Sequence, residues 1–287
     1  MVRFLTTTTL ALAMLAAPLF GANGNVTYLA LGDSIAFGFD PTLFPPYAKH
    51  PAQNANKFTG YPEKVEDFVN KKEVNASCPG ETSGSFLNVN APDNGCHGPQ
   101  GFKETVGLHT NYNGSQASFA ASELASNKQI NLVTLSIGGN DLLLLQEYCN
   151  KNYLPSGFAY CVGTNLPSVL TAYAGNLGAI LGAIRANYHG TLVLMTSYAP
   201  SADPLFVQAI KALNQAMVDV NTVGHFGVKF ADAFTAFQIA SAIFPNDPCK
   251  AGLLIRLSKP YDQPVCDVHP SPIGRDILAV TVLLANH

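Results

Sequence analysis

The sequence predicts a three-layer α/β/α sandwich with a mostly parallel central sheet. Short apolar runs alternate along the chain with segments of helical periodicity, and this alternation is typical of a parallel sheet that carries helices on both faces. Neither a linker nor an internal repeat interrupts the pattern in the 287 residues. We therefore expect one domain over residues 23–287, with its ligand site beyond the carboxyl ends of the strands.

Five segments are expected to be strands. The strongest is the segment 130–137, Ile-Asn-Leu-Val-Thr-Leu-Ser-Ile, which stops at Gly138. Residues 26–31 form a shorter apolar run that ends at a Gly-Asp turn. The other three are a weak strand that leads into Cys78, residues 191–196 and residues 228–231.

Helical spacing predicts the helices between these strands. In residues 61–71 apolar side chains recur on one helical face, and Pro62 is tolerated in the first turn. The remaining expected helices cover residues 115–127, 141–149, 165–188, 203–222 and 272–285. Residues 39–60 and 83–114 are rich in Pro, Asn and Gly, which predicts two long loops.

Residues 1–22 have the pattern of a secretory signal peptide. Arg3 supplies the positive charge, residues 10–20 form the apolar stretch, and Gly21 and Ala22 are small residues near a plausible cleavage site. The apolar run is shorter than the ~20 residues that a transmembrane helix needs. We therefore expect a secreted, extracellular protein without a transmembrane segment.

The cysteines agree with export. An even number of cysteines, here six, suggests a disulfide framework in an exported chain, although the count alone leaves several pairings open. We favour sequential pairing, because each bridge then closes a short loop rich in Gly, Pro or Asn. The expected bridges are Cys78–Cys96, Cys149–Cys161 and Cys249–Cys266. The rival interpretation is a metal site, but the chain lacks a Cys-x-x-Cys motif or a histidine cluster, so we expect no metal.

Three N-glycosylation sequons also agree with export. They begin at Asn25, Asn75 and Asn113. A single sequon occurs often by chance, so they count only together with the leader, and they are used only in a eukaryotic host.

The charge composition argues against a nucleic-acid partner. The net charge is −3 and charged residues make up 12% of the chain. No stripe of basic residues is present of the kind that neutralises phosphates. We expect a monomer that acts on a small molecule.

Four short fragments carry the chemistry. They are Gly32-Asp33-Ser34, Gly80 within Cys-Pro-Gly-Glu-Thr, Gly138-Gly139-Asn140-Asp141 and His269-Pro270. The first three follow expected strands directly, so the fold brings them to one edge of the sheet. Together they supply a nucleophile, a backbone donor, an amide donor and a general base, which is the set that acyl transfer from an ester to water requires.

The order Ser, Gly, Asn, His along the chain resembles the SGNH (GDSL-type) hydrolase family, from about residue 26 to the end. The resemblance implies a flavodoxin-like sandwich with a five-stranded central sheet. It also implies that Ser34 is the nucleophile and His269 the base, and that no cofactor is needed. The N–H groups of Ser34 and Gly80 and the side-chain amide of Asn140 are then the oxyanion hole.

Each of these residues also has a simpler interpretation. A lone serine after a strand is usually a helix N-cap, and glycines near a cysteine or before Asn-Asp are common in turns. The surrounding motifs favour the catalytic interpretation. Ala36 stands where a Gly-x-Ser-x-Gly elbow has its second glycine, which argues against an α/β-hydrolase. We expect Asp141 to cap the following helix and to take no part in the chemistry.

The third member of the triad stays open. The family usually has Asp three residues before the histidine, but Cys266 stands there and the nearest carboxylate is Asp267, two residues before His269. Two residues is an awkward reach for a side chain to hold that imidazole. Either Asp267 or the main-chain carbonyl of Cys266 orients His269, and a Cys249–Cys266 bridge would fix that loop.

The substrate is not determined by these motifs, because the family includes lipases, phospholipases, arylesterases and carbohydrate acetylesterases. Loops 39–60 and 83–114 either shape an apolar pocket or use their aromatic residues as ordinary anchors. We expect an esterase or lipase that acts on lipid-like or short acyl esters. The alternatives are a carbohydrate acetylesterase and a secreted binding protein that has lost catalysis.

Overall fold

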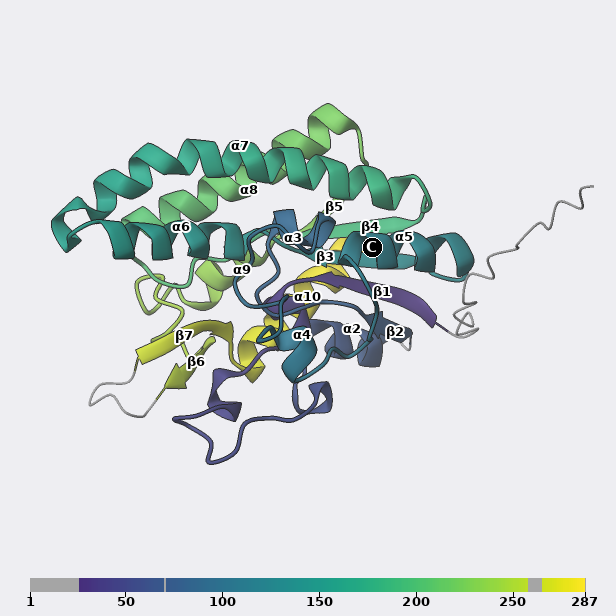
Figure 1. Ribbon diagram of the computed structural model, residues 1–287, viewed down its shortest axis with the longest axis horizontal. Helices are drawn as coiled ribbons and strands as arrows, with labels where there is room; N and C mark the ends of the chain where they lie inside the picture. The colour runs from purple at the N-terminus through teal and green to yellow at the C-terminus, as the bar shows by residue number, and fades with distance from the viewer. Residues whose placement is uncertain (1–25, 70, 258–264, 287) are drawn as a thin grey trace, which may run out of the picture.

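A computed structural model of the chain describes residues 26–69, 71–257 and 265–286. Its centre is a sheet of five parallel strands in the order β2-β1-β3-β4-β5 (Figure 1). The strands are β1 (Val26–Gly32), β2 (Lys72–Asn75), β3 (Leu132–Ser136), β4 (Thr191–Met195) and β5 (Lys229–Ala231). All five expected segments form these strands, and the α/β fold class is confirmed. The expected signal peptide, residues 1–22, and the sequon at Asn25 lie outside the described residues.

Ten α-helices surround the sheet within the described part of the chain. They are α1 (Ser34–Phe37), α2 (Tyr61–Val69), α3 (Ser83–Leu87), α4 (Phe102–Thr105), α5 (Gln116–Ser126), α6 (Gly139–Asn152), α7 (Phe158–Arg185), α8 (Pro204–Gly224), α9 (Ala233–Ala240) and α10 (Pro272–Asn286). Three short 3₁₀ turns, η1 (Pro41–Leu43), η2 (Ala55–Lys57) and η3 (Pro155–Gly157), lie in the connections. The sequence predicts α2, α5, α6, α7, α8 and α10, and it misses α9 and the three short helices α1, α3 and α4.

The sheet separates two apolar cores. Side chains alternate along a strand, so β1 sends Leu29 and Leu31 to one face and Tyr28 and Ala30 to the other. Helices α5, α7 and α8 cover the first face, where Leu124, Leu177 and Leu213 are among the buried residues. Helices α2, α9 and α10 cover the second, where Val65, Phe237 and Leu278 are buried. Figure 1 shows these helices on opposite sides of the sheet.

Helix α7 begins seven residues earlier than the expected helix 165–188. Pro167 lies inside α7, although an interior proline removes one helical hydrogen bond. The turns before it are held by the Cys149–Cys161 disulfide and by burial of Val162 against α6. Tertiary packing therefore extends the helix across a residue that, by sequence alone, marks a helix start.

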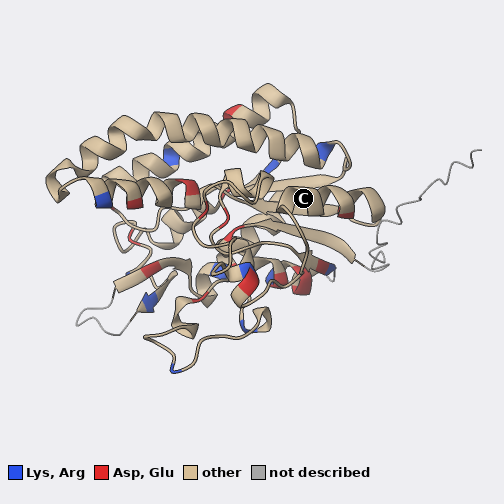
Figure 2. Ribbon diagram, in the orientation of Figure 1, with Lys and Arg blue, Asp and Glu red and all other residues tan. Residues whose placement is uncertain are grey.

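The same stretch, Pro155–Arg185, is long and apolar enough to cross a membrane by length and composition. Only Arg185 in α7 is charged, and Figure 2 shows this helix almost without charged residues. Within the fold, Tyr173, Leu177 and Ile180 of α7 are buried in the core below it. A core helix passes this test as readily as a membrane span, so the helix is weak evidence for a membrane.

An antiparallel pair of strands, β6 (Leu254–Leu257) and β7 (Val265–Pro270), stands apart from the main sheet. The sequence analysis leaves both segments unassigned. Their apolar content is broken by charged residues such as Arg256 and Asp267, and most of β7 is only partly buried. This pair matters for function, because β7 carries His269.

Three disulfides join Cys78 to Cys96, Cys149 to Cys161 and Cys249 to Cys266, the sequential pairing favoured from the sequence.

The two sequons within the described residues differ in solvent exposure. Asn75 is only 2% exposed, and its amide donates to the carbonyl of Ala36 and to Glu63. The expectation of a glycan at Asn75 is therefore wrong, because a buried and bonded amide cannot carry one. Asn113 is exposed and stays a prediction.

Candidate active site

The carboxyl ends of three adjacent strands bring the sequence-predicted residues to one edge. Strand β1 lies between β2 and β3, and main-chain hydrogen bonds continue past the strand ends. The Asp33 N–H donates to the Ser136 carbonyl at 3.0 Å, and the Cys78 N–H donates to the Gly32 carbonyl at 3.0 Å. The turns that follow the three strands are thus tied to one another directly before Ser34, Gly80 and Asn140.

Ser34 is the first residue of the short helix α1. Asp33 caps this helix by accepting from the Ile35 N–H at 3.0 Å. Gly32, which precedes it, has a φ of +133°, and a Cβ there would lie 2.0 Å from the Ser136 carbonyl oxygen. Only glycine permits this close crossing of two strands, and the crossing turns the chain so that Ser34 lines a cavity.

Asp33 itself is buried beside the nucleophile. Burial raises the pKa of Asp33 to about 7, with smaller contributions from Asp141 and Glu81, while the Ile35 N–H opposes the shift. A carboxyl group in this position is therefore close to its titration point at neutral pH.

The imidazole of His269 contacts both Ser34 and Asp267. Its Nε2 lies 2.8 Å from Ser34 Oγ, and its Nδ1 is hydrogen-bonded to Asp267 Oδ1. The same carboxylate oxygen accepts from the His269 N–H at 3.0 Å. Burial raises the pKa of Asp267, but the hydrogen bond and charge of His269 outweigh it and leave that pKa below its ordinary value.

The sequence suggests that the Asp267 side chain is badly placed to reach the His269 imidazole, and this prediction is wrong. Both residues lie in β7, and side chains two residues apart on a strand point to the same side. The carboxylate therefore meets the imidazole edge without any distortion of the chain. Within the described residues the hydrogen-bond partner of Nδ1 is the Asp267 carboxylate, and His269 donates no hydrogen bond to the Cys266 carbonyl.

Hydrogen bonds to Glu81 and Asn94 connect Asn140 to the segment that carries Gly80. Asn140 Nδ2 donates to the Glu81 carbonyl at 2.9 Å, and Asn140 Oδ1 accepts from Asn94 Nδ2 at 3.0 Å. Gly80 has a φ of +87°, a conformation that favours glycine. In the described part of the chain neither the Gly80 N–H nor the Ser34 N–H has a hydrogen-bond partner, so both are free to bind a ligand oxygen.

Asp141 does not cap the helix that follows it. Helix α6 begins at Gly139 with Gly138 as its N-cap. The Asp141 carboxylate instead accepts from the N–H of Ser83 at 2.9 Å and from its hydroxyl at 2.6 Å. It therefore binds the first turn of α3 and connects β3 to the segment that carries Gly80.

An apolar cavity of about 280 Å³ opens beside Ser34 and Asn140. Its walls come from α6, α7, α8, the segment between β4 and α8, and β7. The apolar side chains that line it include Leu142, Leu145, Phe158, Val162, Leu166 and Ile210. None of the described lining residues belongs to loops 39–60 or 83–114, so the expectation that these loops shape the pocket is wrong.

The aromatic residues of those loops have a structural role. Phe39, Phe44, Phe58 and Phe102 pack on one another with ring centroids 5.6–6.2 Å apart. The ring of Phe39 also lies 4.8 Å from the imidazole of His269. These rings anchor the loops and support one face of the histidine.

Among the residues that the structure describes, two groups of side chains lie close enough to hold a metal ion by distance alone. They are Cys78, Glu81 and Cys96, and Asp93, Cys96 and His97. Each group depends on a sulfur of the Cys78–Cys96 disulfide, and a disulfide sulfur is not the thiolate that binds metals. The donor chemistry therefore does not fit a metal site.

Three polar residues of the site were missed from the sequence: Glu81, Asn94 and Gln116. Glu81 and Gln116 are fully buried, and Gln116 donates to Glu81 Oε2 at 3.0 Å. Gln116 also exchanges hydrogen bonds with the N–H and carbonyl of Gly32. The only sequence signal was the position of Glu81 next to Gly80, because single polar residues in a loop or helix form no pattern.

Comparison with known proteins places the chain in a family. The model of the GDSL-like lipase/acylhydrolase family matches residues 30–277, which confirms the resemblance seen in the motifs. No curated protein matches the chain by sequence.

Solved structures share the fold at low identity. Phospholipase A1 from Streptomyces albidoflavus NA297 has 16% identity and a TM-score of 0.58, with 92% of this chain and 100% of that chain covered. An extracellular lipase from Streptomyces rimosus has 18% identity and a TM-score of 0.52, with 91% and 100% covered. An acetylxylan esterase from Geobacillus stearothermophilus has 16% identity and a TM-score of 0.51, with 92% and 96% covered.

Proposed function

The chain belongs to the GDSL-like lipase/acylhydrolase family, and on this premise we propose that it is a secreted serine esterase that hydrolyses esters of apolar acyl groups. The observation that carries the proposal is the contact of Ser34 Oγ with His269 Nε2 at 2.8 Å, at the mouth of an apolar cavity. Members of the family are ester-hydrolysing enzymes, so the reaction class is given. The proposal concerns the residues, the substrate and the location.

In the proposed mechanism His269 Nε2 takes the proton of Ser34 as Oγ attacks the ester carbonyl carbon. Asp267 binds Nδ1–H, which selects the tautomer with a free Nε2 and stabilises the imidazolium that forms. The alcohol then leaves with the proton from His269. Water attacks the acyl-serine with His269 again as base, which releases the acid and restores Ser34.

The negative oxygen of each tetrahedral intermediate is bound by three donors in this proposal. They are the N–H groups of Ser34 and Gly80 and the second hydrogen of Asn140 Nδ2, since the first is bound to the Glu81 carbonyl. Donors held in place before the reaction are worth most in a site that excludes water, and loss of one typically costs ~10²–10³ in kcat.

The cavity supports an apolar acyl chain as substrate. Its volume of about 280 Å³ is near the lower end of small-molecule sites, which begin at ~300 Å³. An acetyl group alone would leave most of these apolar walls without contact. We therefore propose acyl chains of intermediate length, and the hydroxyl-lined part near Thr196 and Ser197 faces the alcohol side.

The leader-like sequence and the three disulfides support secretion, because disulfides persist in oxidising compartments. The match to an extracellular lipase fold agrees with this location.

Hydrolysis of p-nitrophenyl esters from acetyl to palmitoyl tests the proposal, with wild type and Ser34→Ala compared. We expect an optimum at intermediate chain length, complete loss in Ser34→Ala, and labelling of wild type alone by a fluorophosphonate. An optimum at acetyl would favour the carbohydrate acetylesterase. Absence of both hydrolysis and labelling would leave a binding protein.

A cavity variant sharpens the assignment of the acyl site. Ala209 lines the cavity and is buried, so Ala209→Leu fills part of the space. The rate on long esters should fall while the rate on the acetyl ester stays near that of wild type. An unchanged chain-length profile would place the acyl chain elsewhere.

A further inference from the structure

The side-chain amide of Asn140 is held in one orientation by two partners. The Glu81 carbonyl can only accept, so Asn140 must turn Nδ2 toward it, at 2.9 Å. Asn140 Oδ1 then faces Asn94 Nδ2, which donates to it at 3.0 Å. An asparagine amide rotates easily about its last torsion, so both contacts are needed to aim the remaining Nδ2 hydrogen.

Asn94 also binds the other side of the proposed oxyanion hole. Its N–H donates to the Gly80 carbonyl at 2.8 Å. A Cβ on Gly80 would lie 2.4 Å from the Asn94 carbonyl oxygen, so the two main chains are in direct contact. One residue thus contacts both Gly80, through its main chain, and Asn140, through its side chain.

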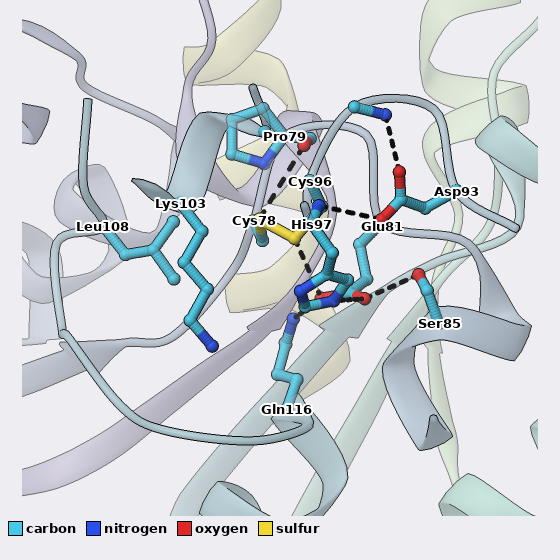
Figure 3. Close-up of a disulfide and its surroundings, with 12 residues drawn as sticks. Cys78, Pro79, Glu81, Ser85, Asp93, Cys96, His97, Lys103, Leu108 and Gln116 are labelled. Carbon is cyan, nitrogen blue, oxygen red and sulfur yellow. Dashed lines mark hydrogen bonds and ion pairs between the residues drawn. A yellow bond between two sulfur atoms is a disulfide. The ribbon is translucent and has the colours of Figure 1, made fainter. Parts of the chain in front are cut away.

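The loop that carries Asn94 is held firmly. The Cys78–Cys96 disulfide closes it, and the Asp93 carboxylate accepts from the N–H groups of Gly95 and His97, both at 2.8 Å (Figure 3). This network fixes the main chain on both sides of Asn94.

Beneath the loop lies the buried carboxylate of Glu81. It accepts from Ser85 Oγ at 2.6 Å and from Gln116 Nε2 at 3.0 Å, and it contacts His97 Nε2 at 3.0 Å (Figure 3). The Cys96 sulfur lies 3.6 Å from Oε2, but a disulfide sulfur has no proton to donate, so this is a packing contact. The Glu81 carbonyl that binds Asn140 is therefore fixed by its own side chain.

We propose that Asn94 is a positioning residue of the oxyanion hole. It donates a hydrogen bond to Asn140 Oδ1 and thereby keeps the free Nδ2 hydrogen directed at the developing negative charge, without touching the substrate itself. This inference rests on the proposed function, since it assigns Asn140 as an oxyanion donor. It gives the active site a residue from loop 83–114, although this loop supplies no wall of the cavity.

The isosteric variant Asn94→Asp is the sharpest test. An aspartate at this position cannot donate to Asn140 Oδ1, and its carboxylate attracts Nδ2 instead, which turns the amide away from the substrate. We expect kcat for a p-nitrophenyl ester to fall roughly 100-fold, as on loss of one oxyanion donor, and KM to change less than twofold. Asn94→Ala, which frees the amide without turning it, should cost about tenfold.

Two controls separate positioning from folding and from charge. Asn94 is exposed, so the thermal unfolding midpoint should stay within about 2 °C of wild type. Asn90 is exposed in the same loop, and its side chain makes no hydrogen bond among the described residues. Asn90→Asp adds the same negative charge and should keep the kcat of wild type.

A double-mutant cycle with Asn140→Ala shows whether Asn94 acts through that amide. In the Asn140→Ala background, Asn94→Ala should cause no further loss. Additive losses, or wild-type kcat in both Asn94 variants while Ser34→Ala is inactive, would overturn the positioning role and leave the esterase intact. An inactive wild type that a fluorophosphonate does not label would overturn both.

Discussion

The two halves of the active site are held in different ways. Ser34 and Asn140 are buried at the ends of central strands. The turns around them are fixed by hydrogen bonds that Asp33 and Gln116 donate and that the Glu81 carbonyl accepts. His269 lies on the accessory pair β6–β7, and most of β7 is only partly buried. The nucleophile half is thus part of the sheet, while the base half is attached to it.

Few contacts attach β7 near the histidine. The Cys249–Cys266 disulfide holds one end, and the Tyr198 hydroxyl donates to the Val268 carbonyl at 2.7 Å. Ser271, directly after β7, donates its N–H to the Leu253 carbonyl at 2.9 Å. The difference teaches that a side-chain change at Asp267 should alter activity without unfolding, whereas a main-chain change in the buried turns of the nucleophile half should alter both activity and stability.

The largest effect is expected from Asp267→Ala. Without the carboxylate the imidazole loses the partner that selects its tautomer, so kcat should fall about 10³–10⁴-fold while the unfolding midpoint stays nearly constant. Steady-state kinetics and thermal denaturation measure the two quantities. Near-wild-type activity would assign the orienting role to the Cys266 carbonyl.

Gly80→Ala, in the nucleophile half, should lower both stability and activity. The new Cβ would lie 2.4 Å from the Asn94 carbonyl in a conformation of positive φ, which costs ~1–3 kcal/mol of stability. The displaced N–H should lower kcat roughly 100-fold. Gly163→Ala is the matched control, because that glycine lies in α7 and a Cβ there meets nothing within 4 Å. A tolerated Gly80→Ala would remove Gly80 from the oxyanion hole.

Removal of single disulfides tests how the base half is attached, with the disulfide between α6 and α7 as the control. Cys249→Ala with Cys266→Ala and Cys149→Ala with Cys161→Ala open loops of similar separation, 17 and 12 residues, so each should cost ~2–4 kcal/mol in urea unfolding. Only the first pair should also lower kcat, by roughly 10–100-fold, because it releases the strand that carries His269. Equal kcat in both variants would contradict the dependence of the base half on its disulfide.

The two aspartates next to the catalytic residues should respond to pH in opposite directions. The raised pKa of Asp33, about 7, means that the unfolded chain releases this proton first. The stability that Asp33 contributes is complete below about pH 4 and is lost as the pH rises through 7, by about 2.6 kcal/mol between pH 5 and 8. The lowered pKa of Asp267 gives a contribution present above its unfolded pKa and lost in acid.

Asp33→Asn tests the pH dependence predicted for the buried Asp33. The asparagine oxygen still accepts from the Ile35 N–H, but it has no proton to release. Urea unfolding at pH 5 and pH 8 should show that the variant loses about 2.6 kcal/mol less stability than wild type over this interval. Parallel losses in the two proteins would show that Asp33 does not titrate there.

The sequence predicts best those parts that depend on one strand or one motif. Residues 130–137 are mostly apolar and stop at Gly138, so β3 and the position of Asn140 after its end follow from local pattern. The β6–β7 pair is short, partly exposed and joined over a distance in sequence, and no periodicity marks it. Because β7 was not predicted, the same-side geometry of Asp267 and His269 could not be foreseen.

The contacts around the oxyanion residues also lie beyond sequence pattern. Asn94 is one of many asparagines in loop 83–114, and only the fold shows that its amide reaches Asn140. The cavity could not be predicted from the sequence either, because its walls come from facing sides of α6, α7 and α8. Periodicity shows that these helices have apolar faces, but not which faces leave a space between them.

Asp267 and His269 occupy one face of a single strand, so any displacement of β7 moves both side chains together. Such a movement changes the distance from Nε2 to Ser34 Oγ but leaves the imidazole's bond to the carboxylate intact. A loosened β7 therefore lowers the fraction of molecules in which His269 contacts Ser34, and kcat falls although Asp267 and His269 stay hydrogen-bonded to each other.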